Sequence, residues 1–299
     1  MKRGQLAADA ALLFVTAIWG ATFVMVQDAV SGFPVFAFLT LRFSLATLAL
    51  LPFFLRARRS SGFRLNAVGT VGFDRLRSLL PGILVGIALF VGYSFQTFGL
   101  RFTTPAKAGF ITGLSVVMVP IGQALFFRKP PDRGAIAGVG LATVGLALLS
   151  LESDLSIHLG DILVFCCAIG FAAHILLVGR FAPAWQPLQL AFVQIVTVAI
   201  LSLGLAGLAE QPIGWPTANV WFAAAFTGLL ATSLAFFLQS RAQRDTTPTH
   251  TALIFSAEPV FAGIFSLLLI GEVLGMRQIA GCALILAGML AAEYRGRSE

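Results

Sequence analysis

Long apolar stretches separated by short polar or charged segments dominate the pattern of hydrophobic and polar positions along the chain. A helix needs about 20 apolar residues to cross the hydrocarbon core of a bilayer. Ten stretches approach that length, bounded by charges and by Pro or Gly, at residues 8–27, 35–55, 78–100, 105–127, 134–151, 159–179, 187–208, 217–239, 248–270 and 276–293. The pattern predicts an all-α integral membrane protein with ten transmembrane helices.

The amino-acid composition excludes a soluble protein. Of the 299 residues, 58% are hydrophobic and 11% are charged, whereas about a quarter of the residues of a soluble domain are charged. The cysteines Cys166, Cys167 and Cys282 show no CxxC or Cys/His spacing, and no Walker motif is present. The sequence therefore predicts no metal or other cofactor and no direct use of ATP.

Basic residues are concentrated at alternate ends of the predicted spans. If the N-terminus is cytoplasmic, Arg101, Lys107 and Arg277 lie outside, and the tails and loops inside contain Lys2, Arg3, Arg56, Arg58, Arg59, Arg64, Arg75, Arg77, Arg128, Lys129, Arg133, Arg180, Arg241, Arg244, Arg295 and Arg297. By the positive-inside rule, both termini are expected to be cytoplasmic, in a chain that crosses the cell membrane. The asymmetry accounts for the net charge of +7 without a nucleic-acid partner. The Arg-rich segment 56–77 can contact anionic lipid headgroups.

An internal repeat is visible when the chain is shifted by 143 residues. Each Thr-Pro pair in it is expected to start a helix, with Thr104 or Thr247 as the N-cap and the proline at the first helical position. The repeat divides the chain into two five-span halves, 1–151 and 152–299. The first-half positions that match without a gap are Thr103, Thr104, Pro105, Ile111, Val117, Ile121, Leu125, Ile136, Ala137, Gly138, Leu141 and Gly145, which fall on Thr246, Thr247, Pro248, Ile254, Val260, Ile264, Leu268, Ile279, Ala280, Gly281, Leu284 and Gly288.

The two halves are expected to be inverted relative to each other, because an odd number of spans separates equivalent positions. Inverted repeats let a transporter form inward-facing and outward-facing states from one fold, with the solute held near the midplane where the halves meet. Duplication that serves stability alone is the alternative.

Several short motifs resemble those of one transporter family. They are Trp19-Gly20 with Thr22-Phe23, Leu-Arg-Phe at 41–43, Ser-Ala-Glu-Pro-Val at 256–260 and Gly271-Glu272. With the ten-span repeat, they resemble the EamA-type branch of the drug/metabolite transporter superfamily. The resemblance implies a secondary transporter, often an exporter of amino acids or related metabolites.

The first half departs from the motifs of the second half at two places. It has Ser115-Val116 where the second half has Glu258-Pro259, and Arg128-Lys129 where the second half has Gly271-Glu272. These departures put in doubt any mechanism that needs paired carboxylates.

Small or polar side chains recur at helical spacing in several spans and predict the wall of a solute site. Close packing of small residues would give similar stripes, and Tyr93 and Gln96 could instead anchor their span at the membrane interface. The predicted solute-binding residues are Trp19, Tyr93, Gln96, Thr112, Ser115, Thr232 and Glu258.

Glu258 is the outstanding polar residue because it lies deep in an apolar span. It follows the start of that span by about 11 residues, roughly 16 Å at 1.5 Å per residue. Burial there penalises the charged carboxylate, and residues of this kind usually mark an ion or solute path. We expect Glu258 to carry a coupling proton, with a structural glutamate as the alternative. Pro259 and Pro120 are predicted hinges, since proline removes a helix hydrogen bond.

Other ionisable residues within or near the spans have more ordinary interpretations. Arg42 needs a partner, and a structural ion pair with Asp28 is preferred to contact with an anionic solute. His174 is a second candidate for proton coupling, although a hydrogen-bonded packing histidine is favoured. Lys107 and His250 occupy equivalent repeat positions, and both are expected to snorkel.

The sequence thus favours secondary transport of a small metabolite, most simply export of amino acids or related compounds by alternating access. A multidrug or cation exporter of the same fold is the alternative. A channel would need a ring of charge or a filter motif, and an enzyme would need clustered acids or histidines, so neither is expected. The expected partners are the solute and membrane lipid, and the expected state is a monomer or weak dimer.

Overall fold

The computed structural model describes residues 3–59, 73–150, 158–210, 213–270 and 275–295. Within these ranges the chain is helical and contains no strand. Gly271-Glu272 and residues 60–72 of the Arg-rich 56–77 segment lie outside the described residues.

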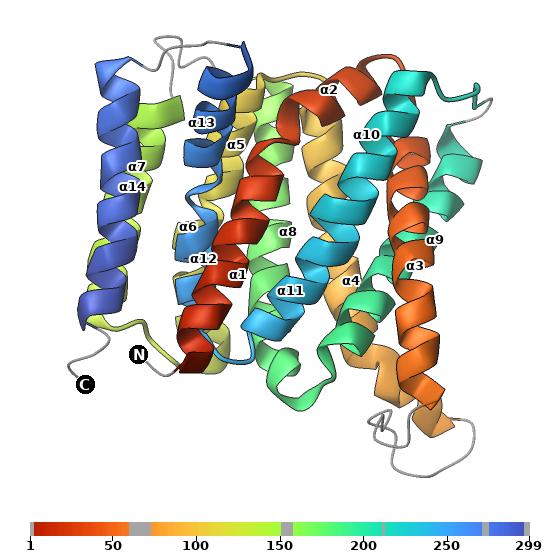
Figure 1. Cartoon of the computed structure of the whole chain (residues 1–299), viewed down its shortest axis with the longest axis horizontal. Helices are drawn as coiled ribbons and strands as arrows, with labels where there is room; N and C mark the ends of the chain where they lie inside the picture. The colour runs from red at the N-terminus through yellow and green to blue at the C-terminus, as the bar shows by residue number, and fades with distance from the viewer. Residues whose placement is uncertain (1–2, 60–72, 151–157, 211–212, 271–274, 296–299) are drawn as a thin grey trace.

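The helices run side by side between two ends of the molecule, and both termini lie at the same end (Figure 1). The last turn of α3 and the first turn of α4 lie at that end too. In chain order the elements are α1 (Arg3–Gly20), α2 (Phe23–Ser31), α3 (Val35–Arg59), α4 (Phe73–Gly99), α5 (Pro105–Gly113), α6 (Ser115–Phe127), α7 (Arg133–Ser150), α8 (Leu159–Phe181), the 3-10 turn η1 (Ala182–Ala184), α9 (Pro187–Ala209), α10 (Ala218–Gly228), the π-helix η2 (Leu229–Leu234), α11 (Ala235–Ala242), α12 (Pro248–Phe255), α13 (Glu258–Ile270) and α14 (Met276–Arg295).

Seven helical stretches in the described part of the chain are long and apolar enough to cross a membrane. The other three predicted spans do not meet this criterion. Two of them contain the shorter apolar helices Arg133–Leu149 and Met276–Ala292, and the third contains the interrupted pair α12 and α13. The ten-span count therefore stays a prediction. The seven stretches are Gly4–Ser31, Val35–Arg59, Leu79–Gly99, Pro105–Phe127, Leu159–Ala184, Pro187–Ala209 and Ala218–Ala242.

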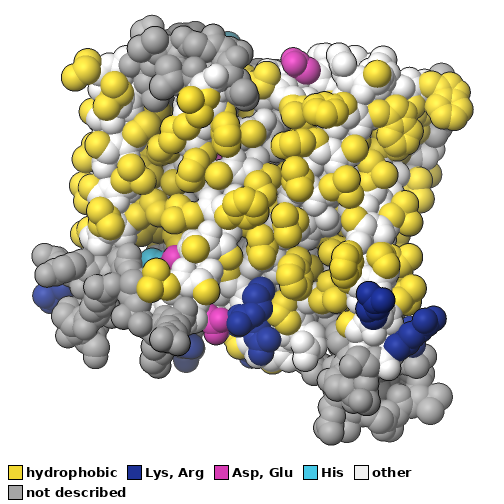
Figure 2. Space-filling model, in the orientation of Figure 1, with side chains coloured by type: hydrophobic (Ala, Val, Ile, Leu, Met, Phe, Trp, Pro, Cys, Tyr) yellow, Lys and Arg dark blue, Asp and Glu magenta, His cyan; other side chains and the backbone are white. Residues whose placement is uncertain are grey.

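The outer surface suits a hydrocarbon solvent. Figure 2 shows hydrophobic side chains covering the visible face between its ends, while Lys and Arg gather at the end that holds the termini. Large apolar side chains such as Leu125, Phe126 and Leu208 are exposed. Contiguous exposed apolar surface of this extent marks contact with lipid or a partner rather than with water.

The two expected Thr-Pro helix starts are confirmed. The Thr104 hydroxyl accepts a hydrogen bond from the Lys107 backbone N–H, and the Thr247 hydroxyl accepts one from the backbone N–H of His250, each at 3.2 Å. Each cap satisfies one of the N–H groups that a helix start leaves unpaired, while the proline needs no partner.

Four long helical stretches are interrupted near their middle. α1 and α2 meet at Ala21–Thr22, α5 and α6 at Leu114, α12 and α13 at Ser256–Ala257, and η2 joins α10 to α11. The break expected at Pro120 is not found, because α6 continues through that residue. The helix is interrupted instead at Leu114, next to Gly113, and glycine is a poor helix former. The rest of α6 tolerates the single N–H that Pro120 lacks.

At one edge of the bundle α7 and α14 approach to backbone contact (Figure 1). A Cβ atom added at Gly138 would lie 2.5 Å from the carbonyl oxygen of Gly288, and one at Gly145 would lie 2.6 Å from that of Gly281. The reverse contacts, from Gly288 to Gly138 and from Gly281 to Gly145, are 2.6 and 2.7 Å. Only glycine leaves room for this approach, as in other close contacts of membrane helices.

We predict that Gly145→Ala destabilises the fold, because its methyl group would meet backbone atoms of α14 that cannot move aside alone. Overpacking of this kind costs roughly 1–3 kcal/mol. Gly140→Ala, on the same helix but with nothing within 4 Å of its added Cβ, is the matched control. The thermal unfolding midpoint in detergent should fall for the first variant and not for the second; equal midpoints would contradict the contact.

Candidate functional site

A cavity lies among the interrupted helices and leaves about 60 Å³ for the centres of water-sized molecules. That is enough for several waters or a small polar group. Of the predicted solute-binding, coupling and hinge residues, those that line the cavity are Trp19, Tyr93, Gln96, Thr112, Ser115, His174, Glu258 and Pro259. Thr232 and Pro120 are not among the lining residues. Thr232 is fully buried behind the wall, and Pro120 is buried within α6.

Trp19 ties α1 to the π-helix η2. Its indole Nε1 donates a hydrogen bond to the Ala231 carbonyl at 2.8 Å, and its ring meets that of Phe255 at 4.8 Å in an edge-on arrangement. A π-helical turn displaces backbone carbonyls from regular α-helical pairing and is frequent at functional sites. The indole therefore partners a carbonyl in the part of the helix that departs from α geometry.

Arg42 is buried in the wall of the cavity, with 2% of its surface exposed. Its Nε donates to Thr232 Oγ1 at 2.9 Å, and its Nη2 donates to the Tyr93 hydroxyl at 3.0 Å. The guanidinium carbon also lies 4.4 Å from the centre of the Tyr93 ring. The expected ion pair with Asp28 is wrong, because within the described residues Arg42 bonds to these two hydroxyl groups and forms no salt bridge.

Tyr93 and Gln96 face the cavity rather than the membrane interface. Tyr93 is 5% exposed, and Gln96 Nε2 donates to Thr112 Oγ1 at 3.3 Å. The Thr112 hydroxyl also lies 3.8 Å from the Cys167 sulfur. These contacts join α4, α5 and α8 along one side of the cavity, so interfacial anchoring does not describe Tyr93 or Gln96.

Glu258 is the first residue of α13 and lines the cavity. Gly20 approaches closely there, since an added Cβ would lie 2.8 Å from the Glu258 carbonyl oxygen. Among the described residues, the Glu258 carboxylate makes no hydrogen bond or ion pair. Its place in the first turn of a helix favours negative charge, but burial opposes that charge. Such a carboxylate is suited to gain and lose a proton or a cationic partner.

His174 lies at the cavity wall within a chain of side-chain hydrogen bonds. Its Nε2 is 2.7 Å from Gln194 Oε1, and Gln194 Nε2 donates to Ser240 Oγ at 3.3 Å. The ring also meets Phe236 edge-on at 5.5 Å. These contacts fit the packing interpretation of His174, and a coupling role for it stays a prediction.

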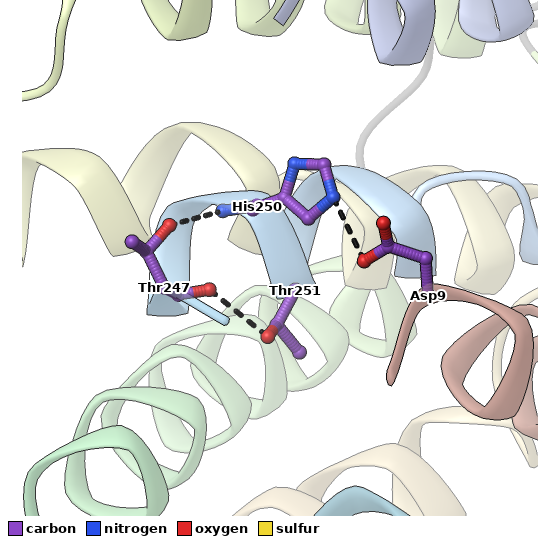
Figure 3. A network of polar contacts seen from close by, with 4 residues as sticks. All are labelled: Asp9, Thr247, His250 and Thr251. Atoms are coloured by element: carbon purple, nitrogen blue, oxygen red, sulfur yellow. Dashed lines mark hydrogen bonds and ion pairs between the residues drawn. The ribbon is translucent and has the colours of Figure 1, made fainter. Parts of the chain in front are cut away.

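A second group of polar contacts lies outside the cavity, where α12 begins (Figure 3). The His250 ring Nε2 is 3.1 Å from Asp9 Oδ1 on α1, and Thr251 donates to the Thr247 carbonyl at 3.0 Å. The expectation that His250 snorkels is therefore wrong, because its ring turns toward the carboxylate of another helix. Sequence reasoning missed Asp9, which is 241 positions away.

The cavity wall also contains residues that the sequence did not single out. They include Phe171 and Phe236, which lie in the wall beside Gln239 and Phe255. Gln239 and Phe255 belong to the helix-spaced stripes that the sequence predicts. Gln239 Nε2 donates to Gln243 Oε1 at 2.9 Å. Phe171 and Phe236 carried no signal, because phenylalanines occur throughout the chain.

The model of the family described as EamA-like transporters matches residues 6–151 and again residues 158–292. The chain belongs to the EamA-like transporter family. Its apolar helices and this membership make it a multi-pass membrane protein of a transporter family.

Curated relatives extend over nearly the whole chain. An "Uncharacterized transporter" of Archaeoglobus fulgidus is 36% identical over 97% of this chain and 87% of its own length. "Uncharacterized transporter YyaM" of Bacillus subtilis is 26% identical over 94% of this chain and 92% of its own length. A solved structure described as "Crystal structure of protein" has a TM-score of 0.78 at 19% identity and covers 98% of this chain and 99% of that chain, which is a likeness of fold alone.

We predict that a cysteine at position 96 is accessible to water. In a variant without the three native cysteines, Gln96→Cys should react with a small water-soluble thiosulfonate at least about tenfold faster than Phe95→Cys, because only a thiol near water forms the reactive thiolate. Phe95 is the matched control, since it is the neighbouring residue, is exposed on the outer surface and does not line the cavity. Equal rates would mean that the cavity is closed to water.

Proposed function

We propose that the protein is a secondary, ATP-independent transporter that exports a small metabolite, an amino acid or a related compound, by alternating access. The observation that carries the proposal is the cavity at the interrupted helices, where Glu258 and Arg42 lie without a described ionic partner. Broken helices around a cavity with unpaired ionisable groups are typical of solute and coupling-ion sites.

The glycine contacts of α7 and α14 support the inverted repeat. In the 143-residue register Gly138 corresponds to Gly281, and Gly145 corresponds to Gly288. The observed contacts join Gly138 to Gly288 and Gly145 to Gly281, so each contact is the repeat-related copy of the other. Such reciprocal contacts are expected across a two-fold axis. The family model, which matches once before residue 152 and once after it, also supports the halves 1–151 and 152–299.

The proposed orientation places both termini in the cytoplasm and the chain in the cell membrane. It is supported by the excess of basic residues in the tails and loops at the end of the termini (Figures 1 and 2). Such an excess marks the cytoplasmic side of membrane proteins.

Two acid–base pairs between the proposed halves, one of them in direct contact, are suited to act as gates. At the end of the termini, Asp9 of α1 pairs with His250 in the first turn of α12. At the other end, Asp161 in the first turn of α8 interacts electrostatically with Lys107 in the first turn of α5. Lys107 and His250 correspond in the repeat, so each pair joins the first span of one half to the fourth span of the other.

In the proposed cycle one of these pairs opens while the other stays closed. The interruptions at Leu114 and before Pro259 are the proposed hinges, and Leu114 replaces Pro120 as the hinge of the first half. The protein is proposed to act as a monomer or weak dimer.

A multidrug or cation exporter remains a second candidate, because one feature of the cavity favours it. The Glu258 carboxylate shares the wall with the rings of Trp19, Phe171, Phe236 and Phe255. Aromatic faces and a carboxylate together attract organic cations.

We predict that Glu258→Gln abolishes transport or uncouples it from a proton gradient while the protein stays folded. The amide keeps the shape of the side chain but cannot bind or release a proton. The solute would be chosen by a thermal-shift screen of amino acids, sugars, nucleosides and cationic drugs, and transport would be measured in proteoliposomes. Asp245→Asn, at an exposed surface pair, is the control. A Glu258→Gln protein that transports like wild type from acidic to alkaline pH would show that Glu258 is structural.

We further predict that cross-linking positions 9 and 250 stops transport. In a variant without the native cysteines, Asp9→Cys with His250→Cys would be joined by a short impermeant bis-thiosulfonate added from the cytoplasmic side, and reduction should restore flux. The control pair is Arg241→Cys with Asp245→Cys, an i,i+4 pair close to the end of α11, whose cross-link spans no gap between halves. Full flux after complete cross-linking of positions 9 and 250 would refute the gate. Reaction of these two cysteines only with reagent added from the opposite side of the membrane would refute the orientation.

A further inference from the structure

We propose that Arg42 binds the carboxylate of the transported solute, so that the solute is a small organic acid or zwitterion and not an organic cation. The inference rests on the proposed transport function and assigns the part of the cavity that selects the solute.

The first support is the hydrogen-bonding capacity that Arg42 keeps. A guanidinium carries five N–H groups, and the structure uses one on Nε and one on Nη2. Both acceptors are hydroxyl groups, which bring no negative charge. A buried cation without a counter-ion is unfavourable, and the unused N–H groups belong to a side chain that lines the cavity. An anion that enters the cavity would supply both the charge and the missing acceptors.

The second support is the rigid placement of the guanidinium. Thr232 lies in η2 and fixes Nε, while Tyr93 holds Nη2 and also stacks its ring against the guanidinium. Tyr93 is itself packed edge-on against Phe43 and Phe171 at 5.2 Å. Arg42 therefore cannot snorkel to the membrane surface. A fixed planar fork of donors is the arrangement that recognises a carboxylate through two parallel hydrogen bonds.

The third support is the separation of the two ionisable groups. Arg42 and Glu258 line one cavity, yet they form no salt bridge in the described structure. Neither charged group is neutralised by an ion pair in the described structure. A zwitterion could therefore place its carboxylate at Arg42 and its ammonium group toward Glu258. An organic cation would instead meet the uncompensated charge of Arg42 at short range.

The cavity favours a carboxylate over a phosphate group. Among the described residues that line it, Arg42 is the one Lys or Arg, whereas a phosphate dianion generally requires several cationic or backbone donors. The rings of Phe171, Phe236 and Phe255 leave an apolar wall for the rest of the solute. The inferred solute is therefore a monocarboxylate with an apolar body.

The test uses the purified full chain and thermal-shift measurements with three sets of probes: the common L-amino acids, their carboxamides, and the corresponding decarboxylated amines. Some of the amino acids should stabilise the protein, and the amides and amines should not. Stabilisation by amides or amines without any carboxylate, or by none of the amino acids, overturns the inference. Transport of a non-carboxylate that still depends on Glu258 would refute the inference and leave the proposed function standing; the absence of flux for every solute would refute the function itself.

Variants of Arg42 separate a binding role from a structural one. Arg42→Gln should weaken binding of the stabilising amino acid at least about 30-fold, as expected when one member of a buried charge pair is lost. Its unfolding midpoint without ligand should not fall, because the buried charge has gone. Arg42→Lys should keep part of the affinity, and Arg101→Gln, exposed at a helix end, should keep all of it. A fall in the ligand-free midpoint with unchanged affinity would show that Arg42 is structural.

Discussion

The structure depends on the need to satisfy backbone hydrogen bonds where no water is available. In hydrocarbon an unpaired N–H or C=O is costly, so a helix can be interrupted only where protein or a polar cavity covers the break. In the described part of the chain four helical stretches are interrupted, and residues at or beside three of the breaks line the same cavity. The fourth interruption, η2, reaches the cavity through Trp19 and Arg42. The breaks and the cavity are thus one feature of the fold.

The same solvent underlies the roles proposed for Arg42 and Glu258. In water either charged side chain would be hydrated, so the absence of a protein partner would not indicate a functional site. Inside an apolar bundle each must be neutralised by a proton, a ligand or a neighbour. Arg42 contacts two hydroxyl groups and the face of the Tyr93 ring, and Glu258 lines the cavity. In the proposed mechanism a solute or a proton completes the site.

Sequence reasoning succeeded where the signal is local or periodic and failed where it depends on facing helices. The Thr104 and Thr247 caps follow from adjacent residues, and they were found. The helical stretches follow from apolar length, and the cavity-facing side of α4 follows from the spacing of Tyr93 and Gln96. The partners of Arg42 are 51 and 190 positions away. The sequence therefore led to the prediction of an ion pair with the nearby Asp28. No local pattern specifies which faces meet across a bundle.

The contact between α7 and α14 maps onto itself in the proposed repeat. If the two halves exchange conformations, Gly138–Gly288 becomes Gly281–Gly145, which is the other contact already present. The interface is therefore the same before and after the exchange, and no bond in it has to break. The Asp9–His250 contact, in contrast, would be exchanged for one at the opposite end. The α7–α14 contact can thus stay fixed while the two halves exchange conformations. The free energy of switching would then be set by the helices around the cavity and not by this edge of the bundle.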